Sequence, residues 1–130
     1  MAEASVENKV VLVVEDDAQV ALLIKFKLDK SGCQVILAEN GEAALALIRE
    51  KPPDLVILDI MMPVMDGHEM LRIIKADPAT SMVPVIILTA RGMEADILKG
   101  FELGAIDYIV KPFSLAELMV RVTRSLSSAG

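Results

Sequence analysis

Polar side chains that can do chemistry stand directly after short apolar runs in this sequence. VVLVV leads into Glu15 and Asp16, and LVIL leads into Asp59. VIIL leads into Thr89, and YIV leads into Lys111. Carboxylates act as nucleophiles or hold a hard cation, a hydroxyl donates a hydrogen bond, and an ammonium balances negative charge. Together these residue types are suited to handling a phosphoryl group.

The apolar runs indicate strands, and the segments between them indicate helices. The five runs are continuously apolar rather than alternating, which is typical of strands buried on both faces of a parallel sheet. They cover residues 10–14, 35–38, 55–58, 85–88 and 108–110. Helical patterns cover residues 18–31, 41–51, 68–76 and 93–103, and a last helix begins at the capping box SLAE of Ser114.

This alternation predicts an α/β fold in which right-handed helical crossovers join parallel strands. We expect a flavodoxin-like, doubly wound sheet of five parallel strands in the order 2-1-3-4-5, with five helices on both faces. The carboxyl ends of parallel strands meet at one edge, and ligands bind there where the strand order reverses. The first and third strands flank that point, so Glu15 and Asp16 are expected beside Asp59.

Carboxylates gathered at one edge repel one another unless a cation joins them. Oxygen ligands with open positions for water suit Mg²⁺ or Mn²⁺, and the expected ligands include Glu15, Asp16 and Asp59. Asp59 is then the nucleophile that would attack phosphorus and become an acyl phosphate. Lys111 and Thr89 would neutralise or hydrogen-bond the oxygens of the transferred group.

Four motifs, in this order, resemble those of the receiver (response regulator) domain of two-component signalling. They are VLVVEDD, DLVILDIMMPVMDG, VIILTAR and GAIDYIVKPFS, and the resemblance covers residues 9–127. It implies that Asp59 is the phosphoacceptor and that Glu15 and Asp16 form an acidic metal-binding pair. It also implies that the backbone carbonyl of Met61 is a metal ligand.

The resemblance further implies roles for the residues around the phosphoacceptor. Thr89 would be the switch hydroxyl, Lys111 the phosphate partner and Tyr108 the switch aromatic. The peptide bond between Lys111 and Pro112 would be cis and would hold the ammonium over the site. The phosphoryl group would come from a histidine kinase or a phosphotransfer protein, and the domain would catalyse its own phosphotransfer and slow autodephosphorylation without being a turnover enzyme.

The same resemblance places the output on the face made by the fourth helix, the fifth strand and the fifth helix. Phosphorylation would shift this face toward a second arrangement that controls a downstream protein or a C-terminal effector domain. KPFSLAEL is similar to receivers that precede winged-helix DNA-binding domains, which carry a paired Asp-Asp before the switch aromatic. Here the pair is Ile106 and Asp107, with Arg121 as a possible partner of Asp107. We therefore expect a monomer or a weak phosphorylation-dependent dimer, and an apolar spot open to a different partner.

Three alternatives remain beside a stand-alone phosphoacceptor switch. The first is a receiver fragment of a DNA-binding response regulator. The second is a Mg²⁺-dependent phosphatase of the haloacid dehalogenase type, which needs a second Asp as general acid where this chain has Met61. The third is an unphosphorylated interaction module, which would be favoured if Asp59, Lys111 or the acidic pair were missing.

Length and composition limit the class of protein. The 130 residues suffice for one domain, with a tail at residues 1–8 and a tail or linker start at residues 128–130. A net charge of −6 argues against direct binding of nucleic acid or an anionic membrane. The amino terminus lacks the pattern of a signal peptide, and no apolar stretch approaches the roughly 18 residues of a membrane span. With Cys33 as the one cysteine, the sequence indicates a cytoplasmic protein.

Several other residues have plainer interpretations than a role in chemistry. Asp17 is expected to support the acidic pair or to face solvent, and His68 is expected to be an exposed helix residue. Cys33 is expected to be a small buried thiol. The methionines at 61, 62, 65 and 70 are interpreted as core or loop contacts and not as soft-metal ligands.

Overall fold

The predicted alternation of strands and helices is confirmed by a computed structural model that describes residues 6–62 and 65–129. The elements are β1 (Val10–Val14), α1 (Ala18–Lys30), β2 (Gln34–Ala38), α2 (Gly41–Glu50), β3 (Leu55–Asp59), α3 (Gly67–Ala76), β4 (Val85–Ala90), α4 (Glu94–Glu102), β5 (Asp107–Lys111) and α5 (Leu115–Ala129). All neighbouring strands run parallel, in the order β2-β1-β3-β4-β5. This is the predicted flavodoxin-like topology.

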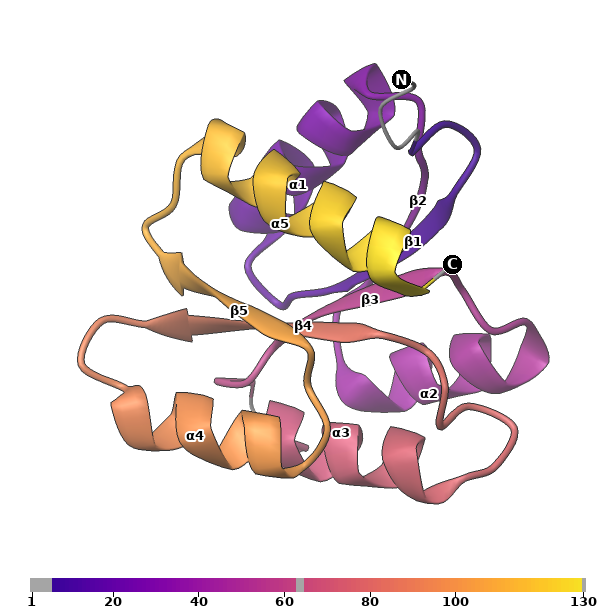
Figure 1. Cartoon of the computed structure of the whole chain (residues 1–130), viewed down its shortest axis with the longest axis vertical. Helices are drawn as coiled ribbons and strands as arrows, with labels where there is room; N and C mark the ends of the chain where they lie inside the picture. The colour runs from indigo at the N-terminus through magenta and orange to yellow at the C-terminus, as the bar shows by residue number, and fades with distance from the viewer. Residues whose placement is uncertain (1–5, 63–64, 130) are drawn as a thin grey trace.

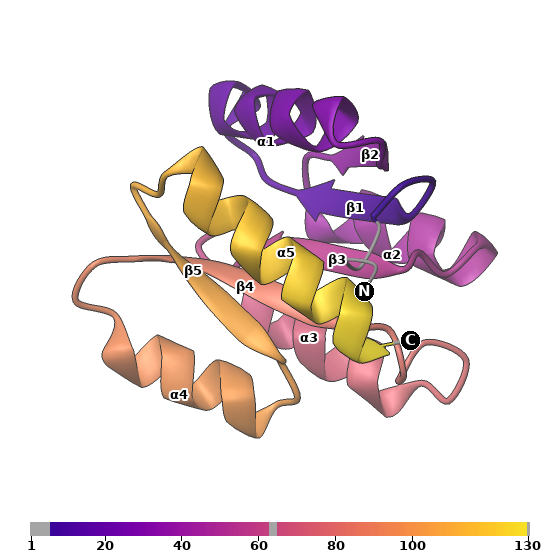
Figure 2. The same ribbon diagram turned by 45° about the horizontal axis from the view of Figure 1, so that its top comes forward.

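The sheet has helices on both faces (Figure 1). Helices α1 and α5 cover one face, and α2, α3 and α4 cover the other. The turned view shows α5 beside α1 on the same face of the sheet (Figure 2). The hydroxyl of Ser31, at the end of α1, lies 3.5 Å from the sulfur of Met119 in α5. The sheet thus separates two apolar cores, as a doubly wound fold requires.

Each core is built from alternate residues of the strands and from one stripe of each covering helix. Toward α2 and α3 the core contains Leu12, Val14, Ala44, Leu45, Ile48, Val56, Leu58, Met70, Leu71, Ile74, Val85 and Ile87. Toward α1 and α5 it contains Val11, Val13, Ile24, Leu28, Leu55, Ile57, Ile86, Leu88, Leu118, Val122 and Leu126. Strand β3 is buried along its whole length. Asp59, the polar residue at its end, is therefore carried by a fully buried strand.

Strand β2 departs from the prediction that all strands are buried on both faces. It lies at the edge of the sheet, and its side chains at Ile36 and Leu37 are exposed. An edge strand has a neighbour on one side alone, so helices that cover the centre of the sheet leave its outer side open to solvent. The apolar run indicated a strand correctly, but the strand order decided how much of it is buried.

Several predicted boundaries move by one or two residues, and three of these shifts concern the site. Asp59, Thr89 and Lys111 lie within the last residues of β3, β4 and β5 instead of just beyond them. The backbone that carries each of these side chains therefore belongs to the hydrogen-bonded ladder of the sheet and not to a loop.

The ends of the described chain are more ordered than the expected tails. Val6 is buried in the core under α1 and α5, and the Asn8 amide donates to the Gly32 carbonyl at 2.8 Å. Helix α5 continues to Ala129. Val6 thus packs into the core and α5 continues past the expected boundary at residue 127, while residues 1–5 and 130 lie outside the described residues.

Lys75 ties the carboxyl end of α3 to the loop that follows it. Its Nζ donates to the carbonyls of Ser81 at 3.0 Å and Val83 at 2.6 Å, and burial lowers its pKa. Lys75→Met would keep the aliphatic stem and leave both carbonyls without this donor. We expect a loss of about 1–3 kcal/mol in the free energy of unfolding, measured by urea denaturation. Lys99→Met, an exposed lysine on α4, is the control, and an equal loss there would contradict the role of Lys75.

Candidate functional site

Three carboxylates meet at the carboxyl edge of the sheet. Glu15, Asp16 and Asp59 each offer an oxygen within 4.8 Å of those of the other two. The Glu15 and Asp59 residues are 2% and 3% exposed, whereas Asp16 faces solvent. The structure therefore brings together the acidic pair and the expected phosphoacceptor, as the strand order predicted.

The register of the sheet explains why these residues meet. Val14 pairs with Leu58, so the residues that follow them, Glu15 and Asp59, lie at the same level of the carboxyl edge. Asp17 then accepts hydrogen bonds from the amides of Gln19 and Val20 and caps α1. Asp17 is exposed, in line with its expected interpretation as a residue that faces solvent, and its cap turns the chain away immediately after the acidic pair.

Lys111 joins two of the carboxylates. Its Nζ lies 3.0 Å from Asp59 Oδ2 and 2.8 Å from Glu15 Oε1, and the peptide bond to Pro112 is cis as expected. The contact with Glu15 is an ion pair whose angles fall short of a hydrogen bond. Burial lowers the pKa of Lys111, but its contacts with Glu15 and Asp59 outweigh burial and raise the pKa above its ordinary value. Lys111 is therefore a fixed positive charge at the site.

The second oxygen of Asp59 is held by the backbone. Asp59 Oδ1 accepts a 2.9 Å hydrogen bond from the amide of Met61, while Oδ2 faces Lys111. The Met61 side chain is 55% exposed and does not fill the site. The amide of Met61 thus orients the carboxylate, and the expected part of its carbonyl in metal binding stays a prediction.

Thr89 and Tyr108, the expected switch pair, lie on the neighbouring strands β4 and β5. Thr89 is 1% exposed, and among the described residues its Oγ1 has no hydrogen-bond partner. A buried hydroxyl without a partner is costly, so a new acceptor at the site would be favourable. Tyr108 is half-buried, with its ring 6.0 Å from the Phe101 ring in an edge contact and 4.9 Å from the Arg121 guanidinium carbon.

The expected ion pair on the output face is present. Arg121 Nη1 lies 2.6 Å from Asp107 Oδ1, and Arg121 Nε lies 3.5 Å from Glu117. Exposed apolar side chains surround this charged group: Leu98, Phe101, Ile106 and Val120. Ile106, which replaces the acid of similar receivers, is 43% exposed. The predicted apolar spot is therefore part of the surface.

Gly67 is a residue of the site that the sequence analysis missed. A Cβ atom at Gly67 would lie 2.4 Å from Ile60 Cα and 2.8 Å from the Asp59 carbonyl oxygen. Its amide donates to the Ile60 carbonyl at 3.2 Å, and Asp66 caps the helix that starts there. The first residue of α3 therefore lies directly against the backbone of the strand that carries Asp59. The DG pair at the end of DLVILDIMMPVMDG was the signal that could have shown this.

His68 is not the exposed helix residue that was expected. Its ring is half-buried, and Nε2 lies 2.9 Å from the backbone carbonyl of Asp96 in the first turn of α4. The partner of His68 lies on α4, so the sequence pattern of α3 alone does not predict it. Cys33 is buried, and Met62 and Met70 are core residues, as expected.

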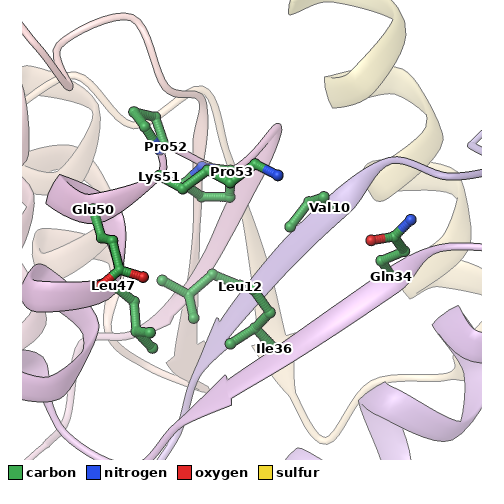
Figure 3. Close-up of a pocket in the computed structure, with 9 residues that line it drawn as sticks. All are labelled: Val10, Leu12, Gln34, Ile36, Leu47, Glu50, Lys51, Pro52 and Pro53. Carbon is green, nitrogen blue, oxygen red and sulfur yellow. The ribbon is translucent and has the colours of Figure 1, made fainter.

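One hollow adjoins two of the carboxylates, a second adjoins the residues that follow Asp59, and a third lies far from both. One, of about 310 Å³, lies beside Glu15 and Asp16, and an open one of about 470 Å³ is lined by Ile60, Met61, Met62, Asp66, His68 and Asp96. The third, of about 180 Å³, lies at the opposite end of the strands (Figure 3). It is lined by Val10, Leu12, Gln34, Ile36, Leu47, Glu50, Lys51, Pro52 and Pro53. Its lining contains none of the residues singled out for chemistry.

The ionisation of Glu15 makes the stability of the metal-free protein depend on pH. The pKa of Glu15 is raised from 4.5 to about 7, mainly by burial and also by the nearby Asp59. Lys111 and the Asp17 amide oppose this increase. The folded state thus binds a proton at pH values where the unfolded state has lost it. The stabilising effect of this proton on Glu15 is complete below pH 4.5 and is lost as pH rises to about 7.

We therefore expect the free energy of unfolding to fall between pH 5 and pH 7, by at most about 1.4 kcal/mol per pH unit for this one proton. Glu15→Gln should remove this slope. Urea denaturation in the presence of a chelator measures both proteins. An identical slope in the two proteins would contradict the assignment to Glu15.

Fold and site together define a doubly wound α/β domain with an acidic pocket at the point where its strand order reverses. The family model described as the response regulator receiver domain matches residues 11–123. The chain belongs to this family, whose members are receiver domains of two-component systems. Receiver domains bind Mg²⁺ at an acidic pocket, and the cluster of Glu15, Asp16 and Asp59 lies at the corresponding place.

Individual relatives include both transcriptional regulators and small receivers. The phosphate regulon transcriptional regulatory protein PhoB of Pseudomonas aeruginosa is 41% identical over 123 residues, which are 95% of this chain and 54% of that protein. The alkaline phosphatase synthesis transcriptional regulatory protein PhoP of Bacillus subtilis is 42% identical over 115 residues, 88% of this chain and 47% of that protein. The chain thus spans about half the length of these curated relatives.

Solved structures agree with the fold. A putative response regulator from Chloroflexus aurantiacus superposes with a TM-score of 0.89 at 36% identity, covering 93% of this chain and 99% of that one. The chemotaxis protein CheY4 of Vibrio cholerae gives a TM-score of 0.85 at 28% identity, covering 91% and 98%. Within the described residues, none of the helices is long and apolar enough to cross a bilayer.

Proposed function

We propose that this domain is a phosphorylation-driven switch whose phosphoacceptor is Asp59. The observation that carries the proposal is the environment of that carboxylate. Asp59 is buried, its Oδ1 is held by the Met61 amide, and its Oδ2 faces the fixed charge of Lys111. A carboxylate held in this way meets phosphorus with little loss of conformational freedom.

In the proposed reaction an oxygen of Asp59 forms a bond to phosphorus while the bond from phosphorus to the donor breaks. When the donor is a phosphohistidine, the leaving imidazole nitrogen takes up a proton. Lys111 would balance charge on the transferred oxygens, and Thr89 Oγ1 would donate a hydrogen bond to them. The hydroxyl of Thr89, which has no hydrogen-bond partner among the described residues, supports this part of the proposal.

The donor set of the acidic cluster fits Mg²⁺ or Mn²⁺, because these hard cations prefer oxygen ligands. Glu15, Asp16, Asp59 and the carbonyl of Met61 are the proposed ligands. Bound there, the cation would neutralise charge on the phosphoryl oxygens. The protein's own contribution is to keep two of these carboxylates buried and within 4.8 Å of the third before the cation arrives.

The output would pass through the face formed by α4, β5 and α5. The Thr89 hydroxyl would move toward the phosphoryl group, and the half-buried Tyr108 would turn into the space left behind it. The apolar side chains of this face would then meet a downstream protein or an effector domain. A histidine kinase or phosphotransfer protein would supply the phosphoryl group, in the cytoplasm, and the domain would act as a switch with slow autodephosphorylation and without substrate turnover.

The test is labelling of the intact chain with acetyl phosphate and Mg²⁺, followed by mass spectrometry. We expect one added phosphoryl group that is lost on treatment with hydroxylamine, as an acyl phosphate is. Failure to take up any phosphoryl group, or uptake on a serine or histidine, would overturn the proposal. Sustained release of p-nitrophenol from p-nitrophenyl phosphate would instead favour the phosphatase alternative.

A second form of the proposal places this receiver in a DNA-binding response regulator. The names of PhoB and PhoP describe transcriptional regulators, and this chain matches about half of each. Light scattering with and without beryllofluoride addresses the output face. Asp107 and Arg121 already pair within the chain, so we expect a monomer or a weak dimer, and a tight dimer in beryllofluoride would contradict this expectation.

A further inference from the structure

Helix α4 is weakly anchored at its amino-terminal end. Of its 9 residues, all within the described part of the chain, Gly100 alone is buried, and Leu98 and Phe101 point to solvent. No described side chain caps the helix at Met93. Gly100 packs against Ile87, because a Cβ there would lie 2.5 Å from the Ile87 side chain. The sheet thus holds the carboxyl-terminal half of α4 and not its first turn.

The first turn of α4 is held from α3 by His68. The two helices lie side by side in both views (Figures 1 and 2), and His68 Nε2 lies 2.9 Å from the Asp96 carbonyl oxygen. A carbonyl oxygen accepts hydrogen bonds and donates none, so the ring must carry its proton on Nε2 and donate it. Both the neutral tautomer with this proton and the protonated ring satisfy the contact.

His68 is also tied to the phosphoacceptor through its neighbour. Gly67 precedes it in the chain and lies against the backbone of Asp59 and Ile60, where no larger residue fits. Asp66 caps the same turn through the Glu69 amide at 2.9 Å. The backbone just before His68 is therefore held against the strand that carries Asp59, and the imidazole bonds to α4.

We infer that His68 is a positioning residue that holds the first turn of α4 in the unphosphorylated arrangement and so opposes the switch. This inference rests on the proposed function. A bond made in one arrangement and lost in the other shifts their populations by its own free energy. A side-chain hydrogen bond of ordinary strength corresponds to about a five-fold shift.

Hydrogen exchange of the unphosphorylated chain tests the positioning role. His68→Leu keeps an apolar side chain without a donor, and His68→Gln restores a donor N–H at similar reach. We expect the amides that bond to carbonyls of the first turn of α4, from Ile97 to Gly100, to exchange about five-fold faster in the leucine variant and at the wild-type rate in the glutamine variant. Arg72→Gln, at an exposed position of α3, is the control and should leave these amides unchanged.

The affinity for beryllofluoride with Mg²⁺ tests the opposition to the switch. We expect the leucine variant to bind about five-fold more tightly than the wild type, and the glutamine variant to match the wild type. Unchanged exchange in α4, faster exchange throughout the chain, or unchanged or weaker beryllofluoride affinity would each overturn the inference. If the wild type itself does not bind beryllofluoride, the proposed function fails, while the exchange experiment still decides the role of His68.

Discussion

Asp59→Asn is expected to reduce phosphoryl labelling by acetyl phosphate and Mg²⁺ to below ~1% of the wild-type level. The amide of asparagine is not a nucleophile at neutral pH. Asparagine has the size of aspartate and keeps an oxygen that can accept a hydrogen bond from the Met61 amide, which lies 2.9 Å from Asp59 Oδ1 in the wild type. The local structure should therefore persist while the chemistry is lost. Mass spectrometry of the intact variant measures the result.

The variant is also expected to be at least as stable as the metal-free wild type. Asp59 raises the pKa of Glu15, so removing its charge lowers the cost of ionising Glu15, which keeps its contact with Lys111. Asp54→Asn is the matched control, because Asp54 is an exposed carboxylate at the other end of the same strand, bonded to the Val10 amide at 2.7 Å. Full labelling of the Asp59 variant, or loss of labelling in the Asp54 variant, would contradict the assignment.

Gly67→Ala is expected to lower the free energy of unfolding by about 3 kcal/mol or more. The added Cβ would lie 2.4 Å from Ile60 Cα and 2.8 Å from the Asp59 carbonyl oxygen, and neither backbone atom can move without shifting the end of β3. Displacement of Asp59 from the Met61 amide and from Lys111 should slow labelling as well. Urea denaturation and the rate of labelling measure the two effects.

Gly41→Ala provides a matched control for this substitution. Gly41 and Gly67 are both the first residue of a helix and both buried. A Cβ at Gly41 would meet the Met65 sulfur at 3.0 Å, and a flexible methionine side chain can give way. We expect Gly41→Ala to change the free energy of unfolding by no more than about 0.5 kcal/mol, since alanine is the better helix former. Equal costs at the two glycines would show that the close contact with Ile60 is not the cause.

Much of the fold was predictable because its signals are local. Continuous apolar runs identified the strands, and the capping box at Ser114 identified a helix start that the structure confirms, because the Ser114 hydroxyl accepts from the Glu117 amide. The burial of β2 was not predictable in the same way. Its apolar run resembles that of a central strand, and the exposure of Ile36 and Leu37 follows from the edge position of β2, which the predicted strand order contains but the apolar run does not show.

By itself, the sequence determined which side chains arrive at the carboxyl edge of the sheet. Glu15, Asp59, Thr89 and Lys111 each follow an apolar run, and parallel strands must end together. The tertiary structure alone decided how these groups act on one another. The raised pKa of Glu15 depends on burial under neighbouring elements. The fit of Gly67 against Asp59 depends on the approach of α3 to β3, and the bond from His68 to Asp96 depends on the packing of α3 beside α4. Burial and contacts between elements are set by residues far apart in the chain, so no local pattern carries them.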